Sequence, residues 1–168
     1  VNVLLHRYED LRPEVKVEEV MAELKEAATD GSFWDKYSMP AVATGKFEAN
    51  RDIQEEYLNL YRSEDLKYSA KSGLQAEDEL VYLLKNGDEE LAEITLKAKG
   101  PAETKLVVFS FREWEILSVK PLFGAQDYYL SLPQDFKVLI NGIGLTPEDG
   151  EQKNADEISY SLQNIYRE

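Results

Sequence analysis

The apolar residues near the start of the chain recur every three to four positions. One face of a helix would carry the series Val17, Val20, Met21, Leu24, Ala27 and Ala28. Gly31 can end this helix, and Pro40 can end a short second one. The spacing therefore predicts helices over Val17–Thr29, Ser32–Ser38 and Asn50–Tyr61, the last with Asn50 as its cap.

From about Leu66 the spacing of apolar residues changes to every second position, as in strands. The turn Asn86-Gly87 is typical of a tight hairpin, because both residues accept a positive φ. In the strand after it, residues 92–98 alternate between apolar and polar, which indicates one buried face and one wet face. The pattern predicts antiparallel strands over Lys67–Gly73, Glu79–Lys85, Glu90–Lys99, Lys105–Phe109 and Phe111–Leu122.

Beyond Gly124 the strands become shorter and the chain more polar. Two short strands are expected over Tyr128–Leu132 and Phe136–Ile140, with a second hairpin turn at Asn141-Gly142. The acidic segment Thr146–Glu157 is interpreted as a loop or linker. The sequence thus predicts an α+β fold, with N-terminal helices packed on a curved antiparallel sheet (residues 1–124) and a small β appendage with an acidic linker (residues 125–168).

Charge and composition exclude several classes of partner. The net charge is −14, from 33 acidic and 19 basic residues, and no basic run is visible, so nucleic acids and anionic membranes should be repelled. No apolar stretch reaches the roughly 18 residues that a membrane helix needs, so this chain is not expected to insert into a membrane itself. Because the first residue is Val1 and not Met, we expect the chain to be processed or cut from a longer protein, in which any leader or anchor would lie upstream. A protein, an envelope polymer or a small ligand remains as partner.

Candidate chemistry is sparse. The absence of cysteine excludes disulfides, zinc–thiolate sites and a thiol nucleophile, and no cofactor is implied. His6 lies among charged residues near the terminus and is interpreted as a surface histidine, with a general base as the alternative. The acidic cluster could bind calcium, but its spacing is not that of an EF-hand, which favours a solvated linker; it comprises Glu148, Asp149, Glu151, Asp156 and Glu157. No residue is assigned a catalytic or metal-binding role.

Aromatic residues are the most informative candidates. Many fall on the predicted helices and strands, where they form either a core or the lining of a cavity that binds a ligand. Trp114 alternates in step with Ile116 and is expected to face inward. The candidate ligand-binding residues are Trp34, Tyr37, Tyr57, Tyr61, Tyr82, Phe109 and Trp114.

The order of elements resembles a known superfamily. With Asp30–Trp34 joining two helices and Trp114–Val119 near the end of the sheet, residues Lys16–Phe123 resemble the cone-shaped fold of the nuclear transport factor two and ketosteroid isomerase superfamily, also called cystatin-like. The segment Leu132–Gly142 is similar to a pattern in ectodomains of membrane-anchored envelope proteins of Gram-positive bacteria. In those ectodomains a strand that starts at a proline runs into an Asn-Gly hairpin after such a cone domain.

The resemblance implies a location outside the cytoplasm, in the cell envelope, as part of a membrane-anchored parent. Isomerases of the superfamily use an acidic base with tyrosine and acid donors inside the cone, but no Asp or Glu is assigned inward here. We expect the interior to be plugged by rings, or open without an acid–base pair. The favoured function is a non-catalytic spacer or binding module for an envelope component, protein partner or small ligand. The alternative is an isomerase- or dehydratase-like enzyme, or a carrier, that uses the interior of the cone.

Overall fold

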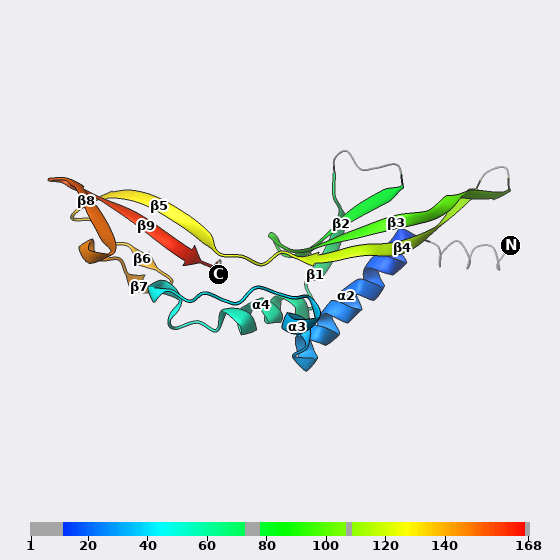
Figure 1. Cartoon of the computed structure of the whole chain (residues 1–168), viewed down its shortest axis with the longest axis horizontal. Helices are drawn as coiled ribbons and strands as arrows, with labels where there is room; N and C mark the ends of the chain where they lie inside the picture. The colour runs from blue at the N-terminus through cyan, green and yellow to red at the C-terminus, as the bar shows by residue number, and fades with distance from the viewer. Residues whose placement is uncertain (1–11, 73–77, 107–108, 167–168) are drawn as a thin grey trace. The chain divides into compact units, whose positions relative to one another are not determined.

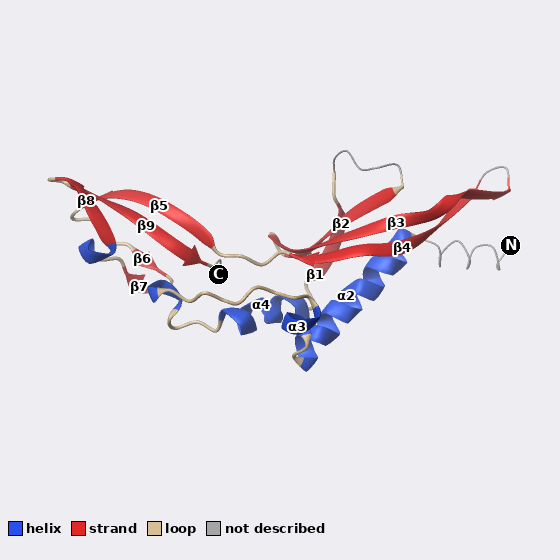
Figure 2. Cartoon of the chain, viewed as in Figure 1, coloured by secondary structure: helices blue, strands red, loops and turns tan. Residues whose placement is uncertain are grey.

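The computed structural model of the chain describes residues 12–72, 78–106 and 109–166, without the side chains of 101–111. It confirms the expected α+β class: N-terminal helices pack against a curved antiparallel sheet, and small further sheets follow near the C-terminus (Figures 1 and 2). The described chain divides into two compact units. One contains residues 12–40 and 57–122, and the other contains 41–56 and 123–166.

The longest described helix, α2 (Pro13–Asp30), is the one that the helical spacing predicts. It starts with proline at its first turn, where no backbone donor is needed, and ends at Gly31 with φ +82. Arg62 closes its last turn by donating from Nε to the Ala28 carbonyl oxygen at 2.9 Å. The buried face contains Val17, Val20, Leu24, Ala27 and Ala28.

The two following α-helices are α3 (Phe33–Lys36) and α4 (Ile53–Arg62). Asn50 does not cap α4. Instead Asp52 Oδ1 accepts a hydrogen bond of 3.0 Å from the backbone N of Glu55, because an aspartate directly before the first turn reaches the free N–H groups there.

The sheet of the first unit has the order β1-β2-β3-β4, with antiparallel neighbours throughout. The expected hairpin is confirmed: Asn86 pairs with Glu89, and Gly87 between them has φ +59. Helix α2 contacts β3 and β4 of this sheet. The strands are β1 Leu66–Ala70, β2 Glu79–Asn86, β3 Glu89–Leu106 and β4 Phe109–Pro121.

Strand β3 carries the buried side of this sheet. Its alternation is as expected, with Ala92, Ile94, Leu96 and Ala98 all buried. A separate strand over Lys105–Phe109 is wrong, because β3 continues to Leu106 and β4 begins at Phe109; residues 107–108 lie outside the described chain. Within β3, Gly100 has φ +74, and the pairing with β4 shifts register between Lys99 and Glu103.

Trp114 pairs with the buried Ala98, which places it on the inner face of the sheet as expected, but it is not fully covered there. Trp114 is only half-buried, and Ile116 on the same strand is 39% exposed. Strand β4 is an edge strand, so nothing in the sheet covers its outer side. It also contains a bulge: Ser118 pairs with Thr95 and Ile116 with Leu96, which leaves Leu117 without a partner on β3.

The second unit is built on a three-stranded antiparallel sheet with β9 in the centre, in the order β5-β9-β8. The predicted second hairpin is confirmed, with φ +48 at Asn141 and φ +77 at Gly142. The strand expected over Phe136–Ile140 shortens to two residues. The bounds are β5 Gln126–Pro133, β6 Leu139–Ile140, β7 Ile143–Gly144, β8 Gly150–Asn154 and β9 Glu157–Ile165.

The interpretation of Thr146–Glu157 as a loop or linker is wrong. The segment forms the turn η2 (Pro147–Asp149), the strand β8 and the first residue of β9. Asp149 organises the turn by accepting from the backbone N of Thr146 at 2.8 Å. Acidic residues are tolerated in β8 because the strand lies at the edge of its sheet with exposed side chains.

The segment 41–56 belongs to the second unit, although it precedes most of the first unit in sequence. It contributes the turn η1 (Lys46–Glu48). Phe47 of this turn lies in a buried cluster with Ile158, Tyr160, Leu162 and Ile165. Lys46 pairs with Asp149 at 2.6 Å, which joins η1 to η2.

Candidate functional site

Four of the seven candidate aromatic residues lie together in the first unit. Tyr37 and Tyr61 both pack against Phe33, with ring centroids 5.0 and 4.7 Å away. Trp34 meets Tyr57 edge-on at 6.0 Å, and Tyr57 meets Tyr61 at 5.2 Å. Phe33 is fully buried at the centre of these contacts. The rings therefore fill this part of the interior with one another.

The hydroxyl groups of Tyr57 and Tyr61 are engaged inside this cluster. The two oxygens are 2.8 Å apart, and both lie within hydrogen-bond distance of the Leu91 carbonyl oxygen, at 3.1 and 2.6 Å. Burial raises the pKa of both phenols well above that of an exposed tyrosine. Both groups thus remain neutral donors, and their protons point to protein acceptors.

The other three candidates lie elsewhere. Tyr82 on β2 contacts Tyr68 on β1 at 6.0 Å and donates to Glu14 of α2 at 3.3 Å. Burial, followed by the nearby Glu14 carboxylate, raises the pKa of Tyr82 to about 12. Trp114 is half-buried opposite Ala98. Phe109 begins β4, and its side chain is not among those described.

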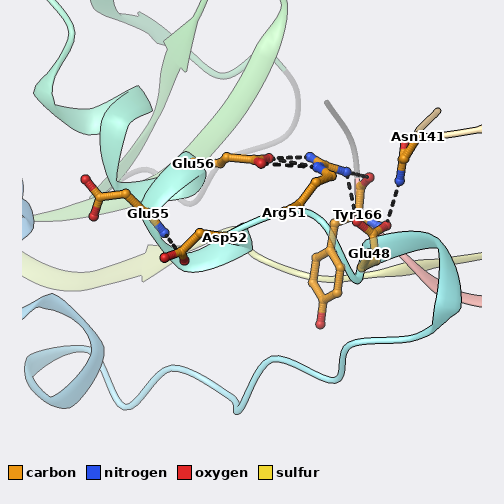
Figure 3. A network of polar contacts seen from close by, with 7 residues as sticks. All are labelled: Glu48, Arg51, Asp52, Glu55, Glu56, Asn141 and Tyr166. Atoms are coloured by element: carbon orange, nitrogen blue, oxygen red, sulfur yellow. Dashed lines mark hydrogen bonds and ion pairs between the residues drawn. The ribbon is translucent and has the colours of Figure 1, made fainter. Parts of the chain in front are cut away.

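Glu48 is the one fully buried charged residue of the described chain, and sequence analysis did not single it out. Figure 3 shows its carboxylate between the side chains of Arg51 and Asn141. Oε1 accepts from Asn141 Nδ2 and from the backbone N of Tyr166, both at 2.9 Å. Oε2 accepts from Arg51 Nη1 at 3.0 Å. Three donors from three segments thus compensate its burial.

Arg51 extends this network to the surface. Its Nη1 also donates to the carbonyl oxygen of Tyr166 at 3.0 Å, and its Nε and Nη2 face the carboxylate of Glu56 (Figure 3). The phenol of Tyr166 accepts from the backbone N of Ala43 at 3.2 Å. The geometry supports a structural role for Glu48, which fastens segment 41–56 to the β6–β7 hairpin and to the end of β9.

An open groove of about 650 Å³ crosses the outer face of the second unit's sheet. The register of β5 and β9 determines which side chains share this face: Tyr129 pairs with Ser161, and Ser131 pairs with Ser159. Glu151 of β8 lies opposite Ser159 on the other side, so a row of polar side chains crosses all three strands. Tyr129 is the aromatic residue on this face, and it is 74% exposed.

One end of the groove is acidic. Glu148 and Glu151 are exposed and make no ion pair within the described chain, whereas Asp149 is bound by Lys46 and Thr146. The hydrogen bond from Lys46 is the main reason that the pKa of Asp149 is lowered. A hydrogen bond from Ser131 Oγ similarly lowers the pKa of Glu157. The side chains that line the groove thus include three carboxylates, of Glu148, Asp149 and Glu151, and one lysine, Lys153.

A second hollow, of about 630 Å³, lies on the opposite face of β5. Tyr128 and Leu139 line it, with 39% and 71% of their surfaces exposed, above the buried Leu162 and Ile165. Its lining is mostly apolar, and it borders the Asn141 end of the Glu48 network. Strand β5 therefore carries a tyrosine on each face, Tyr128 on one and Tyr129 on the other.

The described residues contain no cluster of three or more metal-ligand side chains. The acidic cluster near residue 150 is among those described, whereas His6 lies outside them. None of the helices in the described ranges combines the length and the apolar character needed to cross a membrane. No protein-family model, curated protein or solved structure matches this chain.

The sequence did contain a signal for the groove, which the search for cavity-lining rings in the first unit missed. Tyr129 and Ser131 alternate with apolar residues in β5, and Ser159 and Ser161 do so in β9. Reading Glu157–Ile165 as a strand would have placed these hydroxyl groups on one face. Instead, the acidic residues between Glu148 and Glu157 led to the prediction of a linker that ends at Glu157.

Proposed function

We propose that this chain is a non-catalytic binding module of the cell envelope, carried outside the cytoplasm by a membrane-anchored parent. Its binding surface is the groove on the outer face of the β5-β9-β8 sheet. The observation that carries this proposal is the exposure of Tyr129 beside an open row of polar side chains. Tyrosine is enriched at binding surfaces, because its ring packs against a ligand while its hydroxyl group can still form hydrogen bonds.

The engagement of the other conspicuous groups supports the same proposal. The Tyr57 and Tyr61 hydroxyls are bonded to the Leu91 carbonyl, and the Glu48 carboxylate is bonded to three donors. Catalysis requires an acid or base within reach of a substrate. The groove is open, and its ionisable side chains are three carboxylates, Lys153 and two tyrosines, which suit binding more than proton transfer. A chain without thiols also folds independently of the redox state outside the cell.

Sedimentation with purified, protein-free cell-wall material from a Gram-positive bacterium tests the proposal. The full chain is expected to sediment with the wall, and Tyr129→Ala is expected to lower the bound fraction at least several-fold. Tyr128→Ala is the matched control, because it removes the same ring from the other face of β5. Unfolding midpoints establish that both variants are folded.

Three results would overturn the proposal. The first is an absence of sedimentation, and the second is equal sedimentation of the wild type and Tyr129→Ala. The third concerns turnover: the release of soluble wall fragments during incubation, seen by mass spectrometry, would contradict a non-catalytic role.

A further inference from the structure

We infer that the groove on the second unit takes a neutral oligosaccharide, with Tyr129 stacked against one sugar ring. This inference deepens the proposed binding function and depends on it. Three features of the groove, namely its spacing, its aromatic end and its charge, each point to this class of ligand.

The spacing of the polar side chains follows from the sheet. Opposite residues of an antiparallel pair lie about 4.5–5.5 Å apart, and every second residue of a strand about 6.6 Å apart. Ser131, Ser159 and Ser161 therefore form a grid of hydroxyl groups, and Glu151 continues it on β8. The side chains of Ser159 and Ser161 make no hydrogen bond to another described side chain. A sugar chain carries hydroxyl groups at comparable intervals, and these can bond to this grid.

Tyr129 provides the apolar part of the site. Its ring is exposed on the same face as Ser161 and Ser131. The faces of a sugar ring carry C–H groups, which pack on the electron-rich face of an aromatic ring and leave the sugar hydroxyls free at the edge. A mainly apolar ligand would leave the serine and glutamate groups desolvated without partners, which costs free energy.

Charge selects among sugars. Glu148 and Glu151 are exposed at the groove, and the whole chain carries a net charge of −14. Phosphate-containing and uronate-containing polymers would be repelled. Carboxylates accept strong hydrogen bonds from neutral hydroxyl groups without this repulsion. Lys153 also lines the groove and lies 3.9 Å from Glu157, and Lys46 holds Asp149, so part of the negative charge around the groove is compensated within the chain.

Calorimetry with three matched soluble oligomers tests the inference on the full chain. The probes are N-acetylglucosamine oligomers, which are neutral, glucosamine oligomers, which are cationic, and hyaluronan oligomers, which are anionic. The neutral oligomer is expected to bind best, with little change between low and high salt. Tyr129→Ala is expected to weaken it about tenfold, the loss of one aromatic contact. Ser159→Ala should weaken it less, and Tyr128→Ala should leave it unchanged.

Tighter binding of the cationic or the anionic oligomer would overturn the inference, as would equal loss in Tyr128→Ala and Tyr129→Ala. The outcome also separates the two proposals. Wall sedimentation that depends on Tyr129, without binding of any soluble oligomer, would overturn the oligosaccharide and keep the binding function, with a peptide as the next ligand class to test. Loss of both would overturn both.

Discussion

Asn141 Nδ2 donates a hydrogen bond of 2.9 Å to Glu48 Oε1 across 93 residues of sequence. The contact joins the turn η1 to the β6–β7 hairpin. Because Glu48 is fully buried, the two groups depend on each other: the carboxylate needs donors that replace water, and the hairpin needs an anchor.

Glu48→Gln is expected to destabilise the protein by about 2–4 kcal/mol. The amide removes a charge that faces Arg51 and directs an N–H toward donors, which leaves buried groups without acceptors. Denaturant melts measure the change. Glu56→Gln is the control, because Glu56 contacts the same arginine from an exposed position and should cost less than about 1 kcal/mol. Equal losses of stability in Glu48→Gln and Glu56→Gln would contradict the prediction that the burial of Glu48 makes its charge more important than that of Glu56.

Gly150→Ala is expected to destabilise the second unit by about 1–3 kcal/mol, the usual cost of overpacking. A Cβ at this position would lie 2.7 Å from Ile158 Cγ2, from the Ser159 carbonyl oxygen and from Tyr160 Cδ1. Backbone strain is not the cause, because φ is −132. Gly144→Ala has open space around its Cβ and should change stability by less than about 0.5 kcal/mol. Equal thermal midpoints for the two variants would show that β8 and β9 separate more easily than the structure indicates.

Tyr57→Phe and Tyr61→Phe are expected to cost about 1 kcal/mol each, and the double variant more than their sum. Either single variant leaves one phenol to donate to the Leu91 carbonyl oxygen, whereas the double variant leaves that oxygen with the backbone N of Leu122, at 2.7 Å, and with neither phenol. A double-mutant cycle from denaturant melts measures this coupling. Additive losses would mean that the two hydroxyl groups do not share one acceptor.

Stability is expected to fall as the pH rises above about 10. An unfolded tyrosine loses its proton near that pH, while burial raises the pKa of Tyr82 in the folded protein to about 12. Between these values the unfolded chain binds fewer protons than the folded one. The contribution of the Tyr82 phenol to the free energy of unfolding is therefore fully present below pH 10 and is lost as the pH approaches 12. Melts from pH 8 to 12 should show a shallower decline for Tyr82→Phe, and parallel curves would contradict the prediction.

Local patterns sufficed for much of the first unit. The helical spacing from Val17 to Ala28 predicted α2, and Gly31 marked its end. Asn86-Gly87 and Asn141-Gly142 each predicted a hairpin, since a positive φ is a property of one or two residues. The candidate site was less predictable: of the seven chosen rings, four proved to pack on one another around Phe33, and the groove lay in the other unit.

The α+β class, the order of helices before strands and the two Asn-Gly hairpin turns follow from local sequence, because each depends on a periodicity or a backbone angle that neighbouring residues specify. The tertiary structure decided the rest. It assigned residues 41–56 to the second unit, buried Glu48 and left Trp114 half-exposed on an edge strand. Burial of a carboxylate depends on donors brought from residues 51, 141 and 166, and exposure of a ring depends on what covers it. Neither the donors around Glu48 nor the cover over Trp114 can be predicted from the residues next to them in sequence.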